Sequence, residues 1–272
     1  MYRQNNTLVI GSSGYLGRCI TQMLGANVVI PTHCTTPLFP DSLRYNFFTD
    51  DVNSVVDTST IATIIFAAMV EFEPTAKVQE GIERFVKGCK DKRLIYLSSD
   101  GIFDGERGNY SEEDLPAPNT LYGRNLLLCE QLMAECCLNH CIIRPSYIYG
   151  YSNGQLDKRL ATTRAALEAG QEVKLFDDMY KSPLGVKQVA QAVINLSASN
   201  YRGILHVAGE RLSIFDFHRQ AMRAMGVETD RLTSHPMPTN GEFVRDVSLN
   251  FSRWQTLTGG KPLSVKETLS NG

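Results

Sequence analysis

The chain has 272 residues, and its 27 Lys and Arg residues against 29 Asp and Glu residues give a formal charge of -2. This balance offers no large basic surface to nucleic-acid phosphates, so we expect no nucleic-acid partner. The 43% hydrophobic and 21% charged residues are typical of a globular protein with a well-buried core, which excludes disordered and collagen-like chains.

The start of the sequence and its apolar runs indicate a protein that is neither exported nor bound to a membrane. Residues 1–6 lead into a strand without the apolar segment of a secretory signal. The longest apolar run, Ile61 to Val70, is much shorter than the ~18 residues of a membrane-spanning helix. We therefore expect a cytoplasmic location.

The seven cysteines form no C-x-x-C pair, so reduced thiols are expected. Cys136, Cys137, His140 and Cys141 are close enough in sequence to suggest a zinc site. Adjacent cysteines at a helix end point in different directions, however, and His140-Cys141 opens an apolar strand in which small thiols pack well. We predict core positions here and no metal site.

The first half of the chain alternates short apolar runs with helical patterns. Strands are predicted at 7–10, 28–30, 63–66, 93–97 and 141–144, and helices at 14–24, 75–89 and 120–138. Strands that alternate with helices favour right-handed βαβ units and a parallel sheet covered on both faces.

After Gly150 the pattern is less regular. Helices are predicted at 155–169, at 187–197 and from 213, with strands at 172–175 and 203–207. Neither an internal repeat nor a low-complexity linker separates the two halves. We predict an α/β protein with a doubly wound parallel sheet in residues 1–150 and a smaller mixed lobe in residues 151–272, packed on it.

A glycine-rich turn, Gly11-Ser-Ser-Gly14-Tyr-Leu-Gly17, joins the first strand to the first helix. Glycines at this place let the backbone approach a pyrophosphate, which the N–H groups and positive dipole of the helix N-terminus then bind. The alternative is a tight turn without a ligand. The dinucleotide contacts predicted in this segment are Gly11, Ser13, Gly14, Tyr15, Leu16 and Gly17.

The second strand ends without the carboxylate that usually binds the adenosine ribose of NAD. Arg18 and His33 could instead face a 2′-phosphate, which favours NADP over NAD; the alternative is that both are solvated surface residues. Small side chains after the third strand are expected to line the cofactor, and so is the residue that follows the strand at 141–144. These positions are Ala67, Ala68, Met69 and Pro145.

Later motifs resemble one family. Ser98-Ser-Asp-Gly-Ile-Phe-Asp-Gly105 follows a strand, Pro118-Asn-Thr-Leu-Tyr-Gly123 opens a helix, and Glu130 lies in that helix. Together with the G-x-x-G-x-x-G spacing, they resemble the dTDP-4-dehydrorhamnose reductase branch of the extended short-chain dehydrogenase/reductases. Further landmarks in the same order are at 144–150, 178–183, 205–209 and 245–250. The resemblance implies a Rossmann-type NAD(P)-binding domain and a C-terminal lobe that holds a substrate, often a nucleotide-linked keto sugar.

The resemblance also implies roles for two hydroxyls. Ser99 matches the residue that hydrogen-bonds the substrate carbonyl, with Ser98 as the alternative, and Tyr122 matches the proton donor and acceptor. In ketone reduction such a phenol gives its proton to the developing alkoxide while the serine holds that oxygen. The structural alternative is that Ser99 caps a strand end and Tyr122 packs against the sheet.

The sequence departs from the family at one position. The family's lysine, four residues after the tyrosine, is replaced by Leu126, and Asn125 could reach a ribose hydroxyl but carries no charge. Without a cation the phenol stays nearer a pKa of about 10, so about one molecule in a thousand is phenolate at pH 7. An atypical reductase or epimerase-like enzyme and a catalytically impaired regulatory module both fit this change, since Leu126 can simply extend an apolar helix face.

Substrate contacts are predicted in the second lobe, where Arg or Lys could pair with a substrate phosphate. The alternative is that each of these positions is an ordinary surface residue. We expect a small-molecule substrate and allow for a homodimer. The predicted contacts are Tyr147, Arg159, Ser182 and Arg245.

Overall fold

The computed structural model describes residues 7–238 and 243–270, which divide into two compact units. The first unit contains the described residues up to Ile102, with Pro116–Arg144 and Ala190–Leu205. The second contains Phe103–Leu115, Pro145–Val189 and the described residues from His206 onward. Each unit is therefore assembled from segments that are separated in the sequence.

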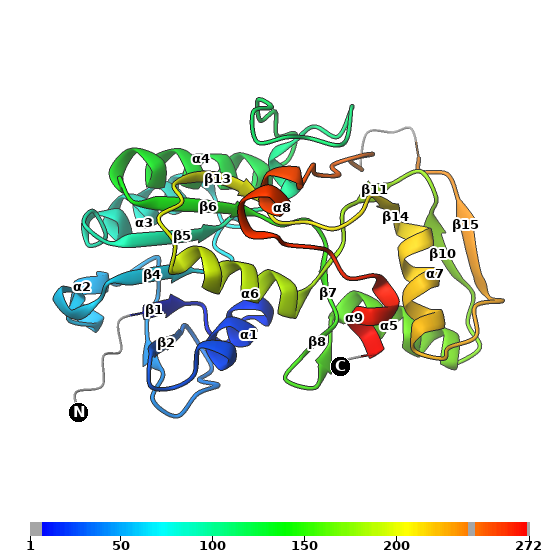
Figure 1. The fold of residues 1–272 in the computed structure, drawn as a ribbon, viewed down its shortest axis with the longest axis horizontal. Coiled ribbons are helices and arrows are strands. Elements are labelled where there is room, and N and C mark those ends of the chain that lie inside the picture. The colour runs from blue at the N-terminus through cyan, green and yellow to red at the C-terminus, as the bar shows by residue number, and fades with distance from the viewer. Residues whose placement is uncertain (1–6, 239–242, 271–272) are drawn as a thin grey trace. The chain divides into compact units, whose positions relative to one another are not determined.

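A seven-stranded sheet forms the first unit, in the order β13-β6-β5-β4-β1-β2-β3 (Figure 1). β1 pairs in parallel with β2 and β4, β2 with β3, β4 with β5, and β5 with β6. From β3 to β6 this is the 3-2-1-4-5-6 order of a Rossmann-type sheet, which confirms the predicted fold class. The strands are β1 (Thr7–Ile10), β2 (Val29–His33), β3 (Leu43–Arg44), β4 (Thr63–Phe66), β5 (Arg93–Leu97), β6 (His140–Arg144) and β13 (Gly203–His206).

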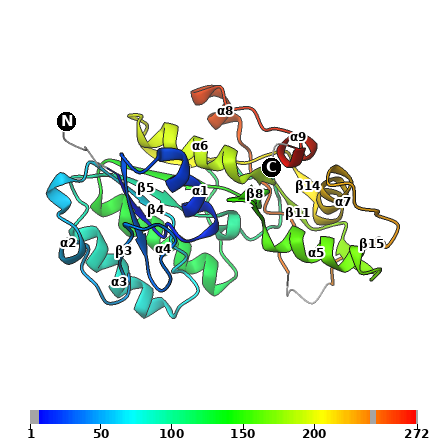
Figure 2. The same cartoon turned by 90° about the horizontal axis from the view of Figure 1, so that it is seen from below.

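Helices cover both faces of this sheet. Figure 2 shows α3 (Thr75–Lys87) and α4 (Leu121–Cys136) on one face, with α1 (Tyr15–Leu24) and α6 (Val186–Ser197) on the other. Because both faces are covered, the central strands are buried and read as continuous apolar runs. Shorter helical segments are α2 (Val52–Val55), η1 (Thr58–Thr60) and η2 (Asp100–Ile102).

An ion pair is buried where α4 packs near β6. Arg144 donates from Nε to Glu130 Oε1 at 2.9 Å and from Nη2 to Oε2 at 2.6 Å. The two side chains are only 2% and 4% exposed, so neither charge is solvated by bulk water. This bidentate geometry offsets the cost of burying both charges and fixes the helix against the strand.

The second unit is made of short strand pairs and helices. β10 pairs in parallel with β15 and β12 with β7, whereas β11–β14 and β8–β9 are antiparallel. Its strands are β7 (Ile148–Tyr149), β8 (Tyr151–Ser152), β9 (Gln155–Leu156), β10 (Val173–Phe176), β11 (Tyr180–Lys181), β12 (Leu184–Gly185), β14 (Leu212–Ser213) and β15 (Leu232–His235). Its helices are α5 (Lys158–Glu168), α7 (Ile214–Ala224), α8 (Ser252–Thr258) and α9 (Val265–Ser270).

The predicted helix at 155–169 begins later than expected. Gln155 and Leu156 form β9, which pairs with β8 through a turn at Gly154, where φ is +72°. Asp157 then caps α5 by accepting a hydrogen bond from the backbone N–H of Leu160 at 3.1 Å. The apolar side chain at 156 therefore belongs to a hairpin and not to the helical repeat.

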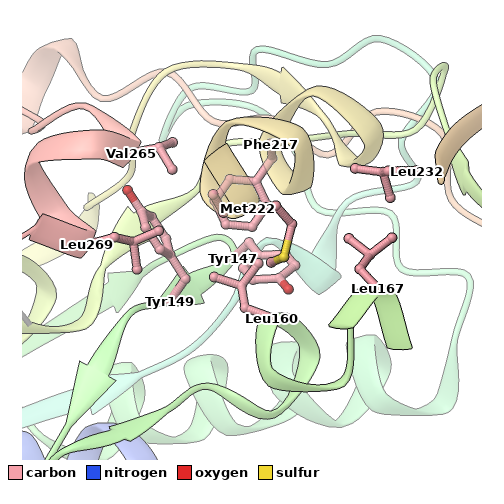
Figure 3. Packing of buried hydrophobic residues seen from close by; sticks show 10 residues of the cluster. Tyr147, Tyr149, Leu160, Leu167, Phe217, Met222, Leu232, Val265 and Leu269 are labelled. Atoms are coloured by element: carbon pink, nitrogen blue, oxygen red, sulfur yellow. The ribbon is translucent and has the colours of Figure 1, made fainter. Parts of the chain in front are cut away.

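Aromatic rings from two segments form the core of the second unit (Figure 3). The ring of Phe217 on α7 lies 4.8 Å from the rings of both Tyr147 and Tyr149. The imidazole of His218 is buried beside them, with Nδ1 2.9 Å from Thr163 Oγ1 and Nε2 3.3 Å from the Tyr147 hydroxyl. Burial lowers the pKa of His218 to about 4, and the nearby Arg159 adds to this effect.

The low pKa of His218 predicts an acid-sensitive fold. Because the pKa is lower in the folded state than in the unfolded state, neutral His218 stabilises the protein above about pH 6.5, and this stability is lost as the pH falls toward 4. We expect the contribution of His218 to the free energy of unfolding to fall by about 2 kcal/mol between pH 7 and pH 5. Urea unfolding of wild type and His218→Asn at both pH values measures it; equal pH dependence in the two proteins would contradict the prediction.

Within the described residues, no helix is long and apolar enough to cross a membrane.

Candidate cofactor and catalytic site

The glycine-rich turn between β1 and α1 is tightly packed by backbone. Gly11 has φ +86°, and a Cβ there would lie 2.7 Å from the Cα and N atoms of Ala68. A Cβ at Gly17 would lie 2.2 Å from the carbonyl oxygen of Gly11. Any residue larger than glycine is therefore excluded at Gly11 and Gly17. The backbone of the turn lies directly against α1 and against the residues that follow β4.

The N-terminus of α1 is built as an anion site. Gly14 is its N-cap, no side chain caps the helix, and its first turn carries no acidic residue. Ser13 and Gly14 are exposed at this end of the helix. Since glycine turns of this kind bring backbone N–H groups and the helix dipole to a pyrophosphate, the residues present fit a dinucleotide.

The other predicted cofactor positions are distributed around this turn and beyond it. The Ala67 N–H donates to Ile10 O at 2.9 Å, and Met69 is 74% exposed. His33 Nδ1 lies 2.7 Å from Ser42 Oγ, so one ring nitrogen already has a protein partner. Arg18 is half-buried in α1, and Pro145 is buried in the second unit. The preference for a 2′-phosphate stays a prediction.

The structure brings Ser99 and Tyr122 together. Ser99 follows β5, and its Oγ donates to Asp100 Oδ1 at 3.0 Å and accepts from the Gly101 N–H at 3.3 Å. Tyr122 lies in the first turn of α4, close enough to Ser99 for the serine hydroxyl to lower the pKa of the phenol. Ser98, the alternative, is buried, and its hydroxyl has no partner among the described residues.

Two close contacts between the start of α4 and η2 position Tyr122 near Ser99. A Cβ at Gly123 would lie 2.1 Å from Gly101 O, and a Cβ at Gly101 would lie 2.9 Å from the Tyr122 ring, so glycines let the start of α4 contact η2. Thr120 caps α4 by accepting from the Gly123 N–H at 3.0 Å. The opposite side of the tyrosine is covered by Phe72, whose ring stacks at 4.6 Å.

The environment of Tyr122 favours its protonated form. Burial raises the pKa of the phenol above its usual value of 10, the negative charges of Glu71 and Asp100 raise it further, and the nearby Ser99 hydroxyl opposes them. The hydroxyl therefore carries its proton at neutral pH. Such a group can donate a proton to a developing alkoxide.

Neither Asn125 nor Leu126 provides a cation for Tyr122, and the guanidinium of Arg124 donates to Asn119 O at 3.1 Å. Leu126 is 1% exposed and shares a buried face of α4 with Cys129 and Met133. Asn125, also buried, donates from Nδ2 to the carbonyl oxygens of Glu71 and Glu73 at 2.9 and 2.8 Å and accepts from Thr75 Oγ1 at 2.8 Å. The idea that Asn125 reaches a ribose hydroxyl is therefore wrong, because its amide clamps the segment after β4.

The predicted substrate residues lie in different environments of the second unit. Tyr147 is in the aromatic core, and Ser182 is buried, with its Oγ accepting from the Leu249 N–H at 3.1 Å. Arg159 stacks on the Tyr147 ring at 3.3 Å and donates to Ile148 O. Arg245 is about half exposed and lies 3.5 Å from an Asp178 carboxylate oxygen.

The sequence did not reveal Glu71, which acts on Tyr122, or its partner Tyr96. Glu71 is 2% exposed, and the Tyr96 hydroxyl donates to its Oε1 at 2.7 Å. The only signal was an acidic residue within a largely apolar segment, Met69-Val-Glu-Phe72. Pairing it with a tyrosine on the neighbouring strand requires the strand register, which the sequence does not provide.

The fold and site define a class. A Rossmann-type sheet, a G-x-x-G-x-x-G turn after its first strand, and a Ser–Tyr pair at the end of β5 and the start of α4 are the features of an extended short-chain dehydrogenase/reductase. A family model described as "RmlD substrate binding domain" matches residues 5–271, and the chain belongs to this family.

Curated relatives cover most of the chain. The spore coat polysaccharide biosynthesis protein SpsK of Bacillus subtilis is 28% identical over 82% of this chain and 80% of its own length. The probable low-salt glycan biosynthesis reductase Agl14 of Haloferax volcanii is 28% identical over 84% of this chain and 83% of its own. The methionine adenosyltransferase 2 subunit beta of Pongo abelii is 24% identical over 96% and 86%.

Solved structures share the fold over nearly the whole chain. A hypothetical dTDP-4-dehydrorhamnose reductase from Sulfolobus tokodaii is 25% identical with a TM-score of 0.82, covering 97% of this chain and 99% of that one. The dTDP-4-dehydrorhamnose reductase of Bacillus anthracis, in complex with NADP, is 19% identical with a TM-score of 0.76 and 97% coverage of both chains.

Proposed function

We propose that this protein is an NAD(P)H-dependent reductase that acts on a carbonyl group of a polar metabolite, in the first instance a nucleotide-linked keto sugar. The proximity of Ser99 and Tyr122, at the carboxyl edge of the sheet that also carries the glycine turn, is the observation that supports this most strongly. The names of the relatives and structural neighbours, several of them reductases, agree with it. A cytoplasmic location and a homodimer are part of the proposal.

The chain's own residues would divide the work as follows. The glycine turn and the N-terminus of α1 hold the pyrophosphate of the dinucleotide, whose reduced nicotinamide supplies a hydride when bound. Tyr122 donates a proton to the carbonyl oxygen of the substrate, and Ser99 hydrogen-bonds that oxygen. Both side chains are half-buried, so water competes less for these interactions than it would at an open surface.

Cofactor and substrate preferences extend the proposal. Arg18 follows the third glycine of the turn, and His33 is the last residue of β2. We propose NADP as the preferred dinucleotide, with these two side chains facing its 2′-phosphate. Arg159 and Arg245 keep much of their side chains exposed and are proposed to pair with phosphate groups of the substrate. Tyr147 and Ser182 are proposed to support these contacts from buried positions.

Replacing Tyr122 with Phe tests the catalytic role. We expect turnover of a keto sugar nucleotide with NADPH to fall by about 100-fold or more, while NADPH affinity stays nearly unchanged, because only the proton donor is lost. Tyr45→Phe is the matched control, since it removes another buried hydroxyl of the first unit that has no partner among the described residues. Turnover that survives in Tyr122→Phe would assign the proton donor to another residue.

Replacing Gly14 with Asp tests the cofactor site. A carboxylate at the helix N-cap would repel the pyrophosphate, and we expect calorimetry to show binding of NADPH weakened by about tenfold or more. Gly14→Ala is the control for crowding, because its Cβ would lie 3.2 Å from Gly11 O without adding charge. Equal dinucleotide binding by wild type and the Asp variant would exclude this turn as the site.

A second candidate function is a regulatory module that binds a nucleotide or a partner without hydride chemistry. The buried Leu126 in place of the lysine favours it, as does the similarity to methionine adenosyltransferase 2 subunit beta. The assay above distinguishes the two functions. If wild type binds a dinucleotide but turns over no keto sugar nucleotide, the regulatory function is supported.

A further inference from the structure

Glu71 is a carboxylate in an unusual place. It lies in the segment after β4 and is 2% exposed, and its Oε1 accepts from the Tyr96 hydroxyl while its Oε2 accepts from the Val70 N–H at 2.9 Å. Within the part of the chain that the structure describes, no Lys, Arg or His forms an ion pair with it. Two neutral donors therefore hold this carboxylate.

The segment that contains Glu71 packs against the helix turn that contains Tyr122. The next residue, Phe72, stacks on the Tyr122 ring, with an angle of 17° between the planes. Asn125, one turn along α4 from Tyr122, binds the carbonyl oxygen of Glu71. Glu71 is thus fixed against the same helix turn as the phenol, and the charge of its carboxylate acts on Tyr122 and on Cys129.

We propose that Glu71, held by Tyr96, is a positioning residue that keeps the proton on Tyr122 and so extends carbonyl reduction to higher pH. The inference rests on the proposed reductase function. In the family that the sequence resembles, an ammonium near the tyrosine favours phenolate; here a buried carboxylate has the opposite sign. Reduction needs the protonated phenol, so a group that keeps this proton in place extends the pH range over which reduction proceeds.

The proposal requires Glu71 to be ionised at the pH at which Tyr122 titrates. Burial raises the pKa of this carboxyl, and its hydrogen bonds from Tyr96 and Val70 oppose the increase. Tyr122 titrates above its usual pKa of 10, where Glu71 is ionised. The other groups facing the phenol are Ser99 and Asp100, and those facing Glu71 are Tyr96 and Cys129, whose own pKa values are raised mainly by burial.

Titration of Tyr122 in the free protein tests the proposal without any substrate. The Cζ resonance of 13C-labelled tyrosine reports phenol ionisation, and Tyr122→Phe assigns the signal. We expect Glu71→Gln to lower the pH at which Tyr122 ionises by about one unit or more. Glu73→Gln is the matched control, because this carboxylate lies two residues away but is 44% exposed and paired with Lys77, and it should leave the titration unchanged.

Two further measurements complete the test. In wild type, ionisation of the Glu71 carboxyl at acid pH should shift the Tyr122 resonance, which gives an answer even if Glu71→Gln fails to fold. In the enzyme assay, Glu71→Gln should move the alkaline limb of the pH profile of reduction down by about one unit, whereas Glu73→Gln should leave it unchanged. An unchanged Tyr122 titration in folded Glu71→Gln, or no coupling in wild type, overturns the role of Glu71. If Glu71 and Tyr122 titrate in a coupled way but no keto sugar nucleotide is turned over, the electrostatic role of Glu71 is supported and the reductase function is rejected.

Discussion

Replacing Leu126 with Lys is expected to lower the free energy of unfolding by about 4 kcal/mol, with no gain in NADPH affinity. Leu126 is 1% exposed, between the buried Cys129 and Met133 of the same helix face and the turn that contains Gly101. An ammonium at this position would be removed from water. The buried carboxylates of this region already have partners: Glu71 accepts two hydrogen bonds from neutral donors, and Glu130 is paired with Arg144.

The control for this substitution is Leu126→Met, which keeps the volume and should cost less than about 1.5 kcal/mol. Melting temperature and NADPH titration of both variants separate a core position from a catalytic one. If Leu126→Lys were as stable as wild type, bound NADPH more tightly and gained alcohol oxidation, position 126 would open to the nicotinamide ribose as in the family. A large loss of stability alone would leave the Rossmann fold correct but exclude the family's catalytic geometry.

Replacing Glu130 with Gln is expected to cost about 3–5 kcal/mol of unfolding free energy, because it leaves the Arg144 guanidinium buried beside a neutral amide. Both partners are nearly inaccessible, and the two short hydrogen bonds between them require a charged, planar acceptor. Urea unfolding followed by far-ultraviolet circular dichroism measures the loss.

The exposed pair between Lys77 and Glu73 in the same unit provides the comparison. Its side chains are 47% and 44% exposed, so Glu73→Gln should change the free energy of unfolding by less than about 1 kcal/mol. A Glu130→Gln variant as stable as Glu73→Gln would show that water or a structural shift compensates the charge of Arg144.

The sheet could be predicted from the sequence because its strands are buried on both faces. Short, largely apolar runs such as Thr63–Phe66 appear at the observed strands, and the helices between them carry regular apolar spacing. Shorter elements were missed. β2 continues through Pro31 to His33, beyond the predicted strand, and two-residue strands such as β12 have no pattern of their own, since pairing partners define them.

The site could be predicted only where a motif carries it. The glycines and the Ser99–Tyr122 pair follow from motif positions and from the rule that ligands bind at the carboxyl edge of such sheets. The partners of Glu71 and Asn125 could not be found, because they depend on how the segment after β4 folds onto α4. The boundary of the substrate lobe at residue 150 and the roles of the site residues stay predictions.

The hydrogen bonds of Asn125 fix the segment before α3, and this affects how a ligand binds there. One amide side chain on α4 binds Glu71, Glu73 and Thr75, and so ties the irregular segment 71–74 and the first residue of α3 to α4. That segment is therefore preorganised. A ligand that touches Phe72 or Tyr122 meets a surface whose backbone is already fixed, so it loses less conformational entropy on binding than it would against a free loop, and more of its contact energy appears as affinity.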